Sequence, residues 1–324
     1  MKKVISLKLT TFFSIGKVQL SIQVGVNTKN KITKFYLLLI LLIVTASCSK
    51  EPELTANPDG VFPELELSQI DKELSQLYKE YNCRIEYRYV ENLLPLDWYN
   101  ITPVNAKQVV PMATFLKENW VMPLEAASSH EFVVKTFPTQ LVFVGSPAFQ
   151  KDGKTEVLGQ AEGGTLLRFT RVNDFDPNNQ DWAITQLTTA FHEYAHILHQ
   201  TFRMPDEFRK VTPNNYTKNG WMAVNNTQAV MLGMVTPYGT SSVQEDFAEL
   251  FSFYIVMPDY LIDERFVDKN PEDYPWMSEE EIRALNHGSA ILRVKLDILK
   301  KFLAEHGFDL ETARNNLQEK LTSN

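Results

Sequence analysis

The stretch HEYAHILHQ, residues 192–200, places two histidines four positions apart, with a glutamate directly after the first. On an α-helix, positions i and i+4 lie on one face, one turn apart, so the imidazoles of His192 and His196 can bind one metal ion. Imidazole nitrogen is a common zinc ligand, and Glu193 lies where it can take a proton from a bound water. The spacing therefore predicts a site for one zinc ion per chain, with Glu193 as general base.

Other interpretations of this stretch compete with a zinc site. A buried helix that carries incidental histidines would also have apolar neighbours such as Phe191, Ile197 and Leu198. A di-iron centre needs two Glu-x-x-His motifs, and the sequence holds only the one from Glu193 to His196, so this alternative is excluded. A zinc hydrolase needs a third ligand from elsewhere in the chain.

The residues after the motif exclude one large class of zinc hydrolases. Metzincins extend the motif to HExxHxxGxxH, whereas this chain has His199 at the glycine position and Phe202 at the last histidine position. Three ligands from barely two turns of one helix would crowd a single zinc ion. We therefore expect His199 to lie beside the ligands, or on the surface, without binding the metal.

A helix further along the chain offers carboxylates for the third position. The segment YGTSSVQEDFAELF, residues 238–251, contains Glu245 and Glu249 four positions apart, on one helical face. Asp246 lies about 100° around the helix from Glu245 and cannot face the same way. Two histidines and one glutamate form the ligand set of thermolysin-type sites, which keep a fourth position open for water. On spacing alone, Glu245 and Glu249 both remain candidates.

These two segments together resemble the catalytic domain of anthrax lethal factor. The shared pattern is an HExxH helix, then a tyrosine seven residues before the first glutamate of E-D-F-A-E-L-F. The resemblance implies three zinc ligands, which are His192, His196 and Glu245. It also implies that Glu193 is the base and that the phenol of Tyr238 stabilises the oxyanion. Glu249 is then left to accept a proton from a ligand imidazole and to fix its tautomer.

Composition narrows the choice of partners. The chain has 324 residues, 44% of them hydrophobic and 22% charged, which suits one large catalytic domain with a leader. Its net charge is −8 and the part after the leader has no basic cluster, so nucleic acid is not an expected partner. We expect a peptide or protein substrate. The aromatic residues Trp221, Tyr274 and Trp276 are expected in the core, although they would also suit ligand stacking.

The N-terminal region has the layout of an export signal. Lysines precede the apolar run FYLLLILLIV, whose ten residues are too few for a membrane-spanning helix, and small residues lead from it to Cys48. This layout resembles a bacterial lipoprotein signal in which Cys48 is acylated. We therefore expect residues 1–47 to form the leader and signal peptide, 48–62 a flexible tether, and 63–324 the catalytic domain.

The whole layout resembles the substrate import-associated zinc metallohydrolase lipoproteins. The lipoprotein signal, the HExxH motif near the middle and the E-D-F-A-E helix carry this resemblance. It implies a domain anchored by lipid in the outer membrane, with a TonB-dependent nutrient importer as partner. The acidic residues just after Cys48 resemble the surface-export signal of some Gram-negative lipoproteins, which would place the domain at the cell surface. The alternative is a lipoprotein that binds substrate for such an importer without catalysis. Glu193 argues against this alternative, because a protein that only binds needs no general base.

The elements that position these residues follow from hydrophobic periodicity. Helices are expected over residues 65–81, 104–121, 181–202 and 241–257, and from about Ser278 and about Ser289. Strands are expected over residues 83–90, 137–146 and 164–172. The last of these strands precedes the HExxH helix, so we expect it to pair with an extended substrate. Residues 204–240 are expected to be loop-rich.

Local signals refine three of these helices. Asp181 is the expected N-cap of the HExxH helix, Pro111 is expected to kink or start its helix, and Gly307 to break the last one. Strands come before the long helices and do not alternate with them, which favours an α+β fold. We expect a zincin-like domain in which a small sheet packs on the HExxH helix and the C-terminal part is helical.

Overall fold

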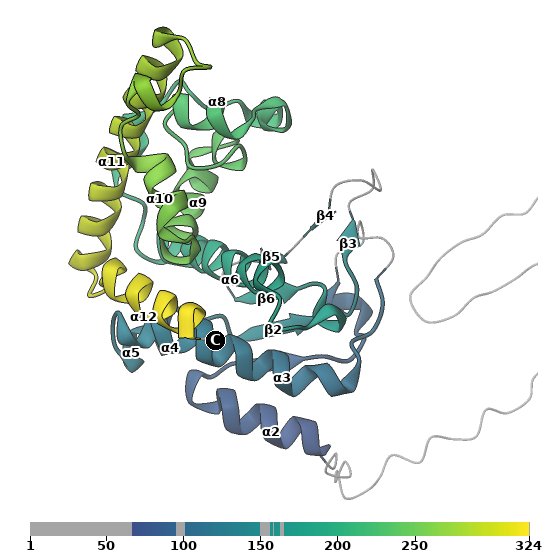
Figure 1. Ribbon diagram of the computed structural model, residues 1–324. Helices are drawn as coiled ribbons and strands as arrows, with labels where there is room; N and C mark the ends of the chain where they lie inside the picture. Colours follow the sequence, from purple (N-terminus) through teal and green to yellow (C-terminus); the bar gives the residue numbers. More distant parts are fainter. Residues whose placement is uncertain (1–66, 95–100, 150–155, 158, 163–164, 324) are drawn as a thin grey trace, which may run out of the picture. The chain divides into compact units, whose positions relative to one another are not determined.

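The described part of the chain is mostly helical and carries a small sheet (Figure 1). The computed structural model describes residues 67–94, 101–149, 156–157, 159–162 and 165–323. The expected signal peptide and tether, with Cys48, lie outside these residues, so their boundaries stay predictions. Residues 66–324 form one compact unit. The expected α+β class is confirmed.

The main sheet has four strands in the order β1 (Arg84–Glu86), β2 (Gln140–Phe143), β6 (Leu166–Phe169) and β5 (Gly159–Glu162). β1, β2 and β6 run parallel, and β5 is antiparallel to β6. All three expected strands are present, in shorter form. β6 lies between β2 and β5, so the expected pairing of a substrate with this strand is wrong. The edge strands of the sheet are β1 and β5. Alternation of apolar and polar residues does not show whether a strand lies in the interior of a sheet or at its edge.

Helix α3 (Ala106–Leu116) begins at Asn105, whose side chain accepts a hydrogen bond from the backbone of Lys107. Pro111 lies inside the helix, so a start at this proline is wrong. One π-helical turn, Lys117–Val121, follows directly. This turn buries the indole of Trp120 against the rings of the core.

Helix α6 (Gln180–Thr201) carries the HExxH motif. Asn179, and not Asp181, is its N-cap, since the Asn179 side chain accepts from the backbone N–H of Trp182. α6 contacts the edge strand β5, as expected for a sheet on the motif helix, and it packs along α9 (Val243–Val256). The ring of Tyr194 on α6 meets Phe251 of α9 on one side and Trp120 on another. α6 is thus held in the centre of the core.

The segment before α9 is more ordered than its sequence suggests. Residues 204–240 were expected to be loop-rich, yet they contain four short helical elements. These are α7 (Asp206–Val211), the 3-10 helix η5 (Lys218–Ala223), α8 (Asn226–Met231) and the 3-10 helix η6 (Tyr238–Thr240). Each has at most six residues, which is too short for helical periodicity to appear.

The C-terminal part contains one long helix where two were expected. α11 (Glu279–Glu305) runs for 27 residues without interruption past Ser289. The reason lies at Gly288, where an added Cβ would come within 1.8 Å of the carbonyl oxygen of Val230 in α8. The glycine permits close approach of another helix and does not break its own. The expected break at Gly307 is confirmed, with φ +82° before α12 (Leu310–Ser323).

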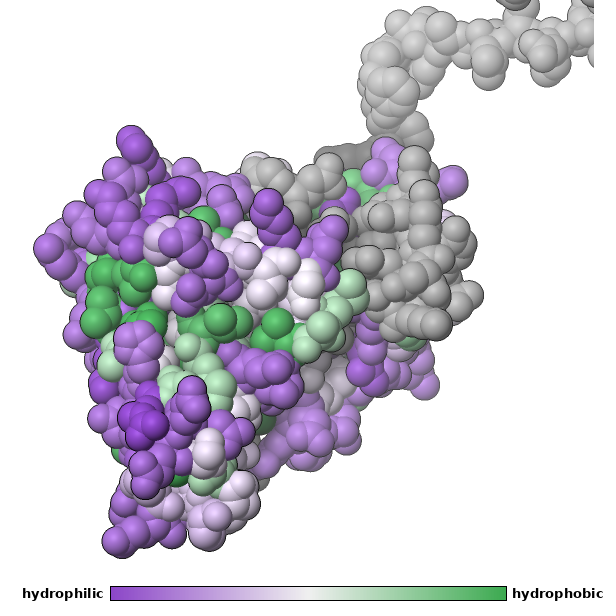
Figure 2. All heavy atoms as spheres, turned by 90° about the horizontal axis from the view of Figure 1, so that it is seen from above, coloured by the Kyte–Doolittle hydropathy of each residue, from purple (hydrophilic) through white to green (hydrophobic). Residues whose placement is uncertain are grey.

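The remaining elements complete this frame. They are α2 (Gln69–Tyr78), α4 (Met122–Ala126), α5 (His130–Thr136), α10 (Asp259–Phe266), the antiparallel pair of β3 (Ala148–Phe149) and β4 (Glu156–Val157), and the short 3-10 helices Lys79–Tyr81, Glu91–Leu93, Val172–Asp174 and Pro271–Asp273. Seen from above, the surface is largely hydrophilic, with hydrophobic side chains in scattered groups (Figure 2). None of the helices in the described ranges is both long and apolar enough to span a membrane.

Candidate metal centre

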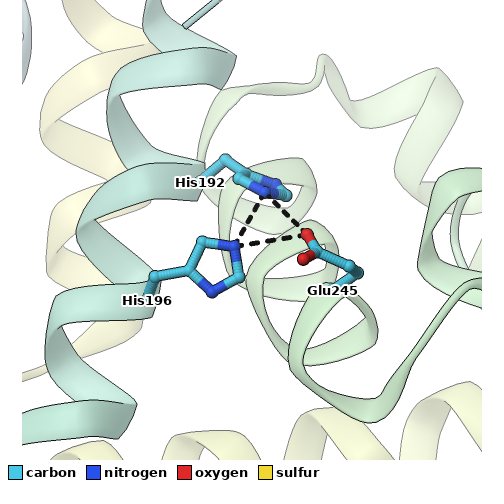
Figure 3. Close-up of side chains that lie close together, drawn as sticks. All are labelled: His192, His196 and Glu245. Atoms are coloured by element: carbon cyan, nitrogen blue, oxygen red, sulfur yellow. Dashed lines mark hydrogen bonds and ion pairs between the residues drawn. The ribbon is translucent and has the colours of Figure 1, made fainter. Parts of the chain in front are cut away.

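Helices α6 and α9 bring three potential metal ligands together (Figure 3). His192 Nε2 and His196 Nε2 lie 3.1 Å apart, and Glu245 Oε2 lies 3.1 Å from the first and 3.2 Å from the second. One ligand atom from each residue fits within 4.8 Å of the others. This is the sequence-predicted set, with both imidazoles on one face of α6.

The start of α9 explains how Glu245 reaches the histidines. Ser242 is the N-cap, and its hydroxyl accepts a hydrogen bond from the backbone N–H of Glu245. In a capping box, the glutamate at this position would turn back to the cap residue. Here the Glu245 carboxylate faces His192 and His196 instead. The cap positions the first turn and leaves the carboxylate available.

The site is electrostatically suited to a cation. Burial acts to raise the pKa of Glu245, but hydrogen bonds with His192 and His196 outweigh it and hold the pKa well below its usual range. Burial acts to lower the pKa of His192, but hydrogen bonds with Glu245 and Glu249 raise it to about 10. Carboxylates therefore stabilise positive charge where the imidazoles meet. A bound metal ion would supply that charge in place of a proton.

Glu249 lies behind the first histidine. Its Oε1 is 2.7 Å from His192 Nδ1, on the opposite side of the ring from Glu245. The hydroxyl of Thr236 donates to Glu249 Oε2 at 2.6 Å and accepts from the backbone N–H of Gly239. A neutral His192 with its proton on Nδ1 would donate to Glu249 and keep Nε2 free for a metal. Sequence reasoning missed Thr236, since no periodicity marks it.

His199 occupies the equivalent place behind the second histidine. Its Nε2 lies 3.0 Å from His196 Nδ1, so it reaches the ring nitrogen that faces away from Glu245. Burial, together with the nearby His196, lowers the pKa of His199 to about 4. A neutral His199 can accept the Nδ1 proton of His196. The structure thus places His199 beside a potential ligand and not in the ligand set.

Tyr238 and Glu193 border the same site. The ring of Tyr238 stacks on the imidazole of His192, with centroids 5.9 Å apart. Burial, and after it the charge of Glu245, raises the pKa of the Tyr238 phenol, so it keeps its proton at neutral pH. Glu193 is half-buried, and its charge also raises the pKa of Tyr238 and of His192.

Asp246 points away from the histidines, as its position on the helix predicts. Its Oδ2 accepts from Lys295 Nζ at 2.6 Å and from the Tyr216 hydroxyl at 2.8 Å. Sequence reasoning did not identify Lys295. The signal was present, because Lys295 interrupts an otherwise apolar stripe that includes Leu292 and Leu299 on α11.

None of the three aromatic residues expected in the core, Trp221, Tyr274 and Trp276, belongs to it, so this expectation is wrong. Trp276 is 75% exposed and meets Tyr274 edge-on, with centroids 5.6 Å apart. Trp221 is half-buried and lies against Tyr238, with centroids 5.0 Å apart, beside the candidate metal centre. Residue type alone does not predict whether a tryptophan lies in the core or at the surface.

Comparisons with known proteins agree with this geometry. Residues 64–311 match the family described as "Putative zinc-binding metallo-peptidase". A crystal structure of a protein described in the same words, from Bacteroides caccae ATCC 43185, superposes with a TM-score of 0.61 and 25% sequence identity, and the match covers 80% of this chain and 95% of that one. No curated protein matches the sequence. The chain therefore belongs to this family.

Proposed function

We propose that the chain is a cell-envelope metallopeptidase that holds one zinc ion with His192, His196 and Glu245. The observation that carries the proposal is the convergence of these donors within 4.8 Å on two packed helices. Two imidazoles and one carboxylate, with one position left for water, are the ligand set of hydrolytic zinc sites. The raised pKa of His192 supports the proposal, because it shows that the surrounding carboxylates favour a cation here.

The neighbouring residues suit peptide hydrolysis. Bound there, zinc would polarise the substrate carbonyl and lower the pKa of a water molecule to about 7. Glu193 takes a proton from the water as its oxygen adds to the peptide carbonyl. The Tyr238 phenol, which burial keeps protonated, donates a hydrogen bond to the oxyanion that forms. Glu193 then delivers its proton to the amine that leaves.

The sheet supports a peptide as substrate. β5 is one of the two edge strands of the sheet, and it contacts α6, the helix that carries both histidines. An extended peptide can add to such an edge through backbone hydrogen bonds, and it would then lie along the motif helix. β5 thus takes the role that was expected of the strand at residues 164–172.

Hydrolysis of a mixed peptide library by the full chain tests this function. Hydrolysis should stop when a chelator removes the metal and return when zinc is restored. The variant Glu193→Gln should keep its zinc and lose roughly a thousandfold or more in rate, because it removes only the base. Loss of zinc from this variant would refute the role of Glu193, and full activity would refute the catalytic proposal.

We further propose that Cys48 is acylated, that the domain is anchored in the outer membrane at the cell surface, and that it serves a nutrient importer. The short apolar run that ends at Cys48 and the acidic residues after it support this location. Fractionation of cells that carry Cys48→Ala should show the chain released from membranes. Unchanged membrane retention would refute the lipid anchor.

A further inference from the structure

A row of aromatic rings leads away from the candidate metal centre. The imidazole of His192 stacks on Tyr238, and Tyr238 meets the indole of Trp221 edge-on, with centroids 5.9 and 5.0 Å apart. Met222, the next residue, is 68% exposed, and Tyr238 is 38% exposed. Trp221, Met222 and Tyr238, here called the aromatic wall, lie outside the hydrophobic core of the described residues.

The aromatic wall is held in place by hydrogen bonds at its base. The backbone N–H of Thr217 donates to the carbonyl of Thr240 at 2.7 Å, and the two threonine hydroxyls lie 2.9 Å apart. Thr217 immediately precedes η5, which carries Trp221, and Thr240 ends η6, which starts at Tyr238. Because both helical turns are tied together, the backbone segments that carry the two rings are held next to each other.

We propose that the aromatic wall is a subsite that binds an apolar side chain, aromatic or long aliphatic, of the peptide substrate. This inference rests on the proposed function. An extended peptide advances about 3.3 Å per residue. The aromatic wall begins at the imidazole of His192, a proposed zinc ligand, so it would contact side chains within about three residues of the scissile bond. Large, rigid rings with exposed faces lose little conformational entropy when they bind. The protein would therefore select peptides by an apolar residue near the cleavage point.

Affinity selection can test the subsite without relying on turnover. The full chain with Glu193→Gln, loaded with zinc and immobilised, is offered a mixed peptide library, and the retained peptides are sequenced. Phe, Tyr, Leu and Met should be enriched over the input. Adding Trp221→Ala should lower the affinity for enriched peptides by roughly tenfold, since it removes one apolar contact surface. Trp221→Phe should retain most of the enrichment.

The matched control is Trp276→Ala. Trp276 is an exposed aromatic residue that contacts Tyr274 and is absent from the candidate centre, so its loss should leave the enrichment unchanged. Enrichment that survives Trp221→Ala, or that falls equally with Trp276→Ala, would overturn the subsite. Hydrolysis by the native chain is measured in parallel. Enrichment that depends on Trp221, without hydrolysis, would refute the proposed function and retain the subsite.

Discussion

Glu245 and Asp246 are neighbours in the sequence, yet helix α9 places their carboxylates in two different regions. The Glu245 side chain is 21% exposed and faces two imidazoles, whereas Asp246 is fully buried against Lys295 and Tyr216. Hydrogen bonds hold the pKa of Glu245 low despite burial, while burial raises the pKa of Asp246 despite Lys295. The Glu245 face of α9 carries a negative charge that a bound cation could neutralise. On the other face, Asp246 is paired with Lys295.

The two faces of α9 therefore have different roles, one in packing and the other in the proposed metal site. Lys295 also donates to the carbonyl of Gly233 at 2.8 Å, and Tyr216 lies earlier in the same connecting segment. The Asp246 face therefore ties α9 to α11 and to the segment that leads to Tyr238. The Glu245 face meets His192 and His196 on the helix with the proposed ligands. We expect changes on the first face to affect stability, and changes on the second to affect metal binding.

The largest expected effect is on zinc affinity in Glu245→Ala. The substitution removes one of three proposed ligands, so zinc binding at neutral pH should be largely abolished. The free energy of unfolding of the metal-free protein should fall by less than it does when a buried charge loses its partner, because His192 can lose its proton once Glu245 is gone. Titration with a competing chelator measures the first quantity and urea denaturation the second. A variant that keeps native zinc affinity would remove Glu245 from the ligand set.

The opposite behaviour is expected of Lys295→Met. The substitution leaves Asp246 buried without its cation, which should cost about 3–5 kcal/mol in free energy of unfolding. The folded fraction should keep nearly native zinc affinity. Urea denaturation of the metal-free chain gives the stability, and the double variant Asp246→Leu/Lys295→Met is the control, since it should recover much of the loss. Zinc loss at unchanged stability would contradict the separation of the two faces.

A smaller effect is expected of Glu249→Ala. Glu249 contacts His192 Nδ1 and not the proposed metal position, so zinc affinity or activity should fall by about 10- to 100-fold. Glu249→Gln should lose less, because its amide oxygen can still accept the imidazole proton. Chelator titration compares both with Glu245→Ala. If Glu249→Ala empties the site while Glu245→Ala stays metallated, the two glutamates must exchange roles.

The smallest effect is expected of Asp71→Asn. Asp71 lies on α2 and belongs to neither face of α9. Asp71 caps α2 through Ser68 and pairs with Arg88 at 2.6 Å, and the hydrogen bond from Arg88 lowers its pKa to about 2. Because the folded pKa is below the unfolded value of about 3.9, its charge stabilises the fold above about pH 4. This contribution is lost as the pH falls toward 2. The stability difference between native chain and variant should therefore shrink over that range, and a constant difference would exclude the charge as its cause.

Local patterns in the sequence predicted much of the site. The HExxH spacing placed His192 and His196 on one face, and the 100° step per residue turned Asp246 away from Glu245. The partners of these residues were not predictable, because Lys295 and Thr236 meet them only through tertiary packing. The same limit applies to Gly288 of α11, because the close approach of α8 that this glycine permits arises only in the folded chain.

Helix α11 also imposes an order on events as the chain is made. The last proposed zinc donor is Glu245, but Lys295 follows Asp246 by 49 residues. Until α11 is synthesised and docked, α9 would have to bury Asp246 without its cation. A nascent or truncated chain that ends before α11 therefore carries the complete HExxH motif but lacks the cation that pairs with Asp246. The cationic partner of Asp246 is therefore synthesised after all three proposed zinc donors.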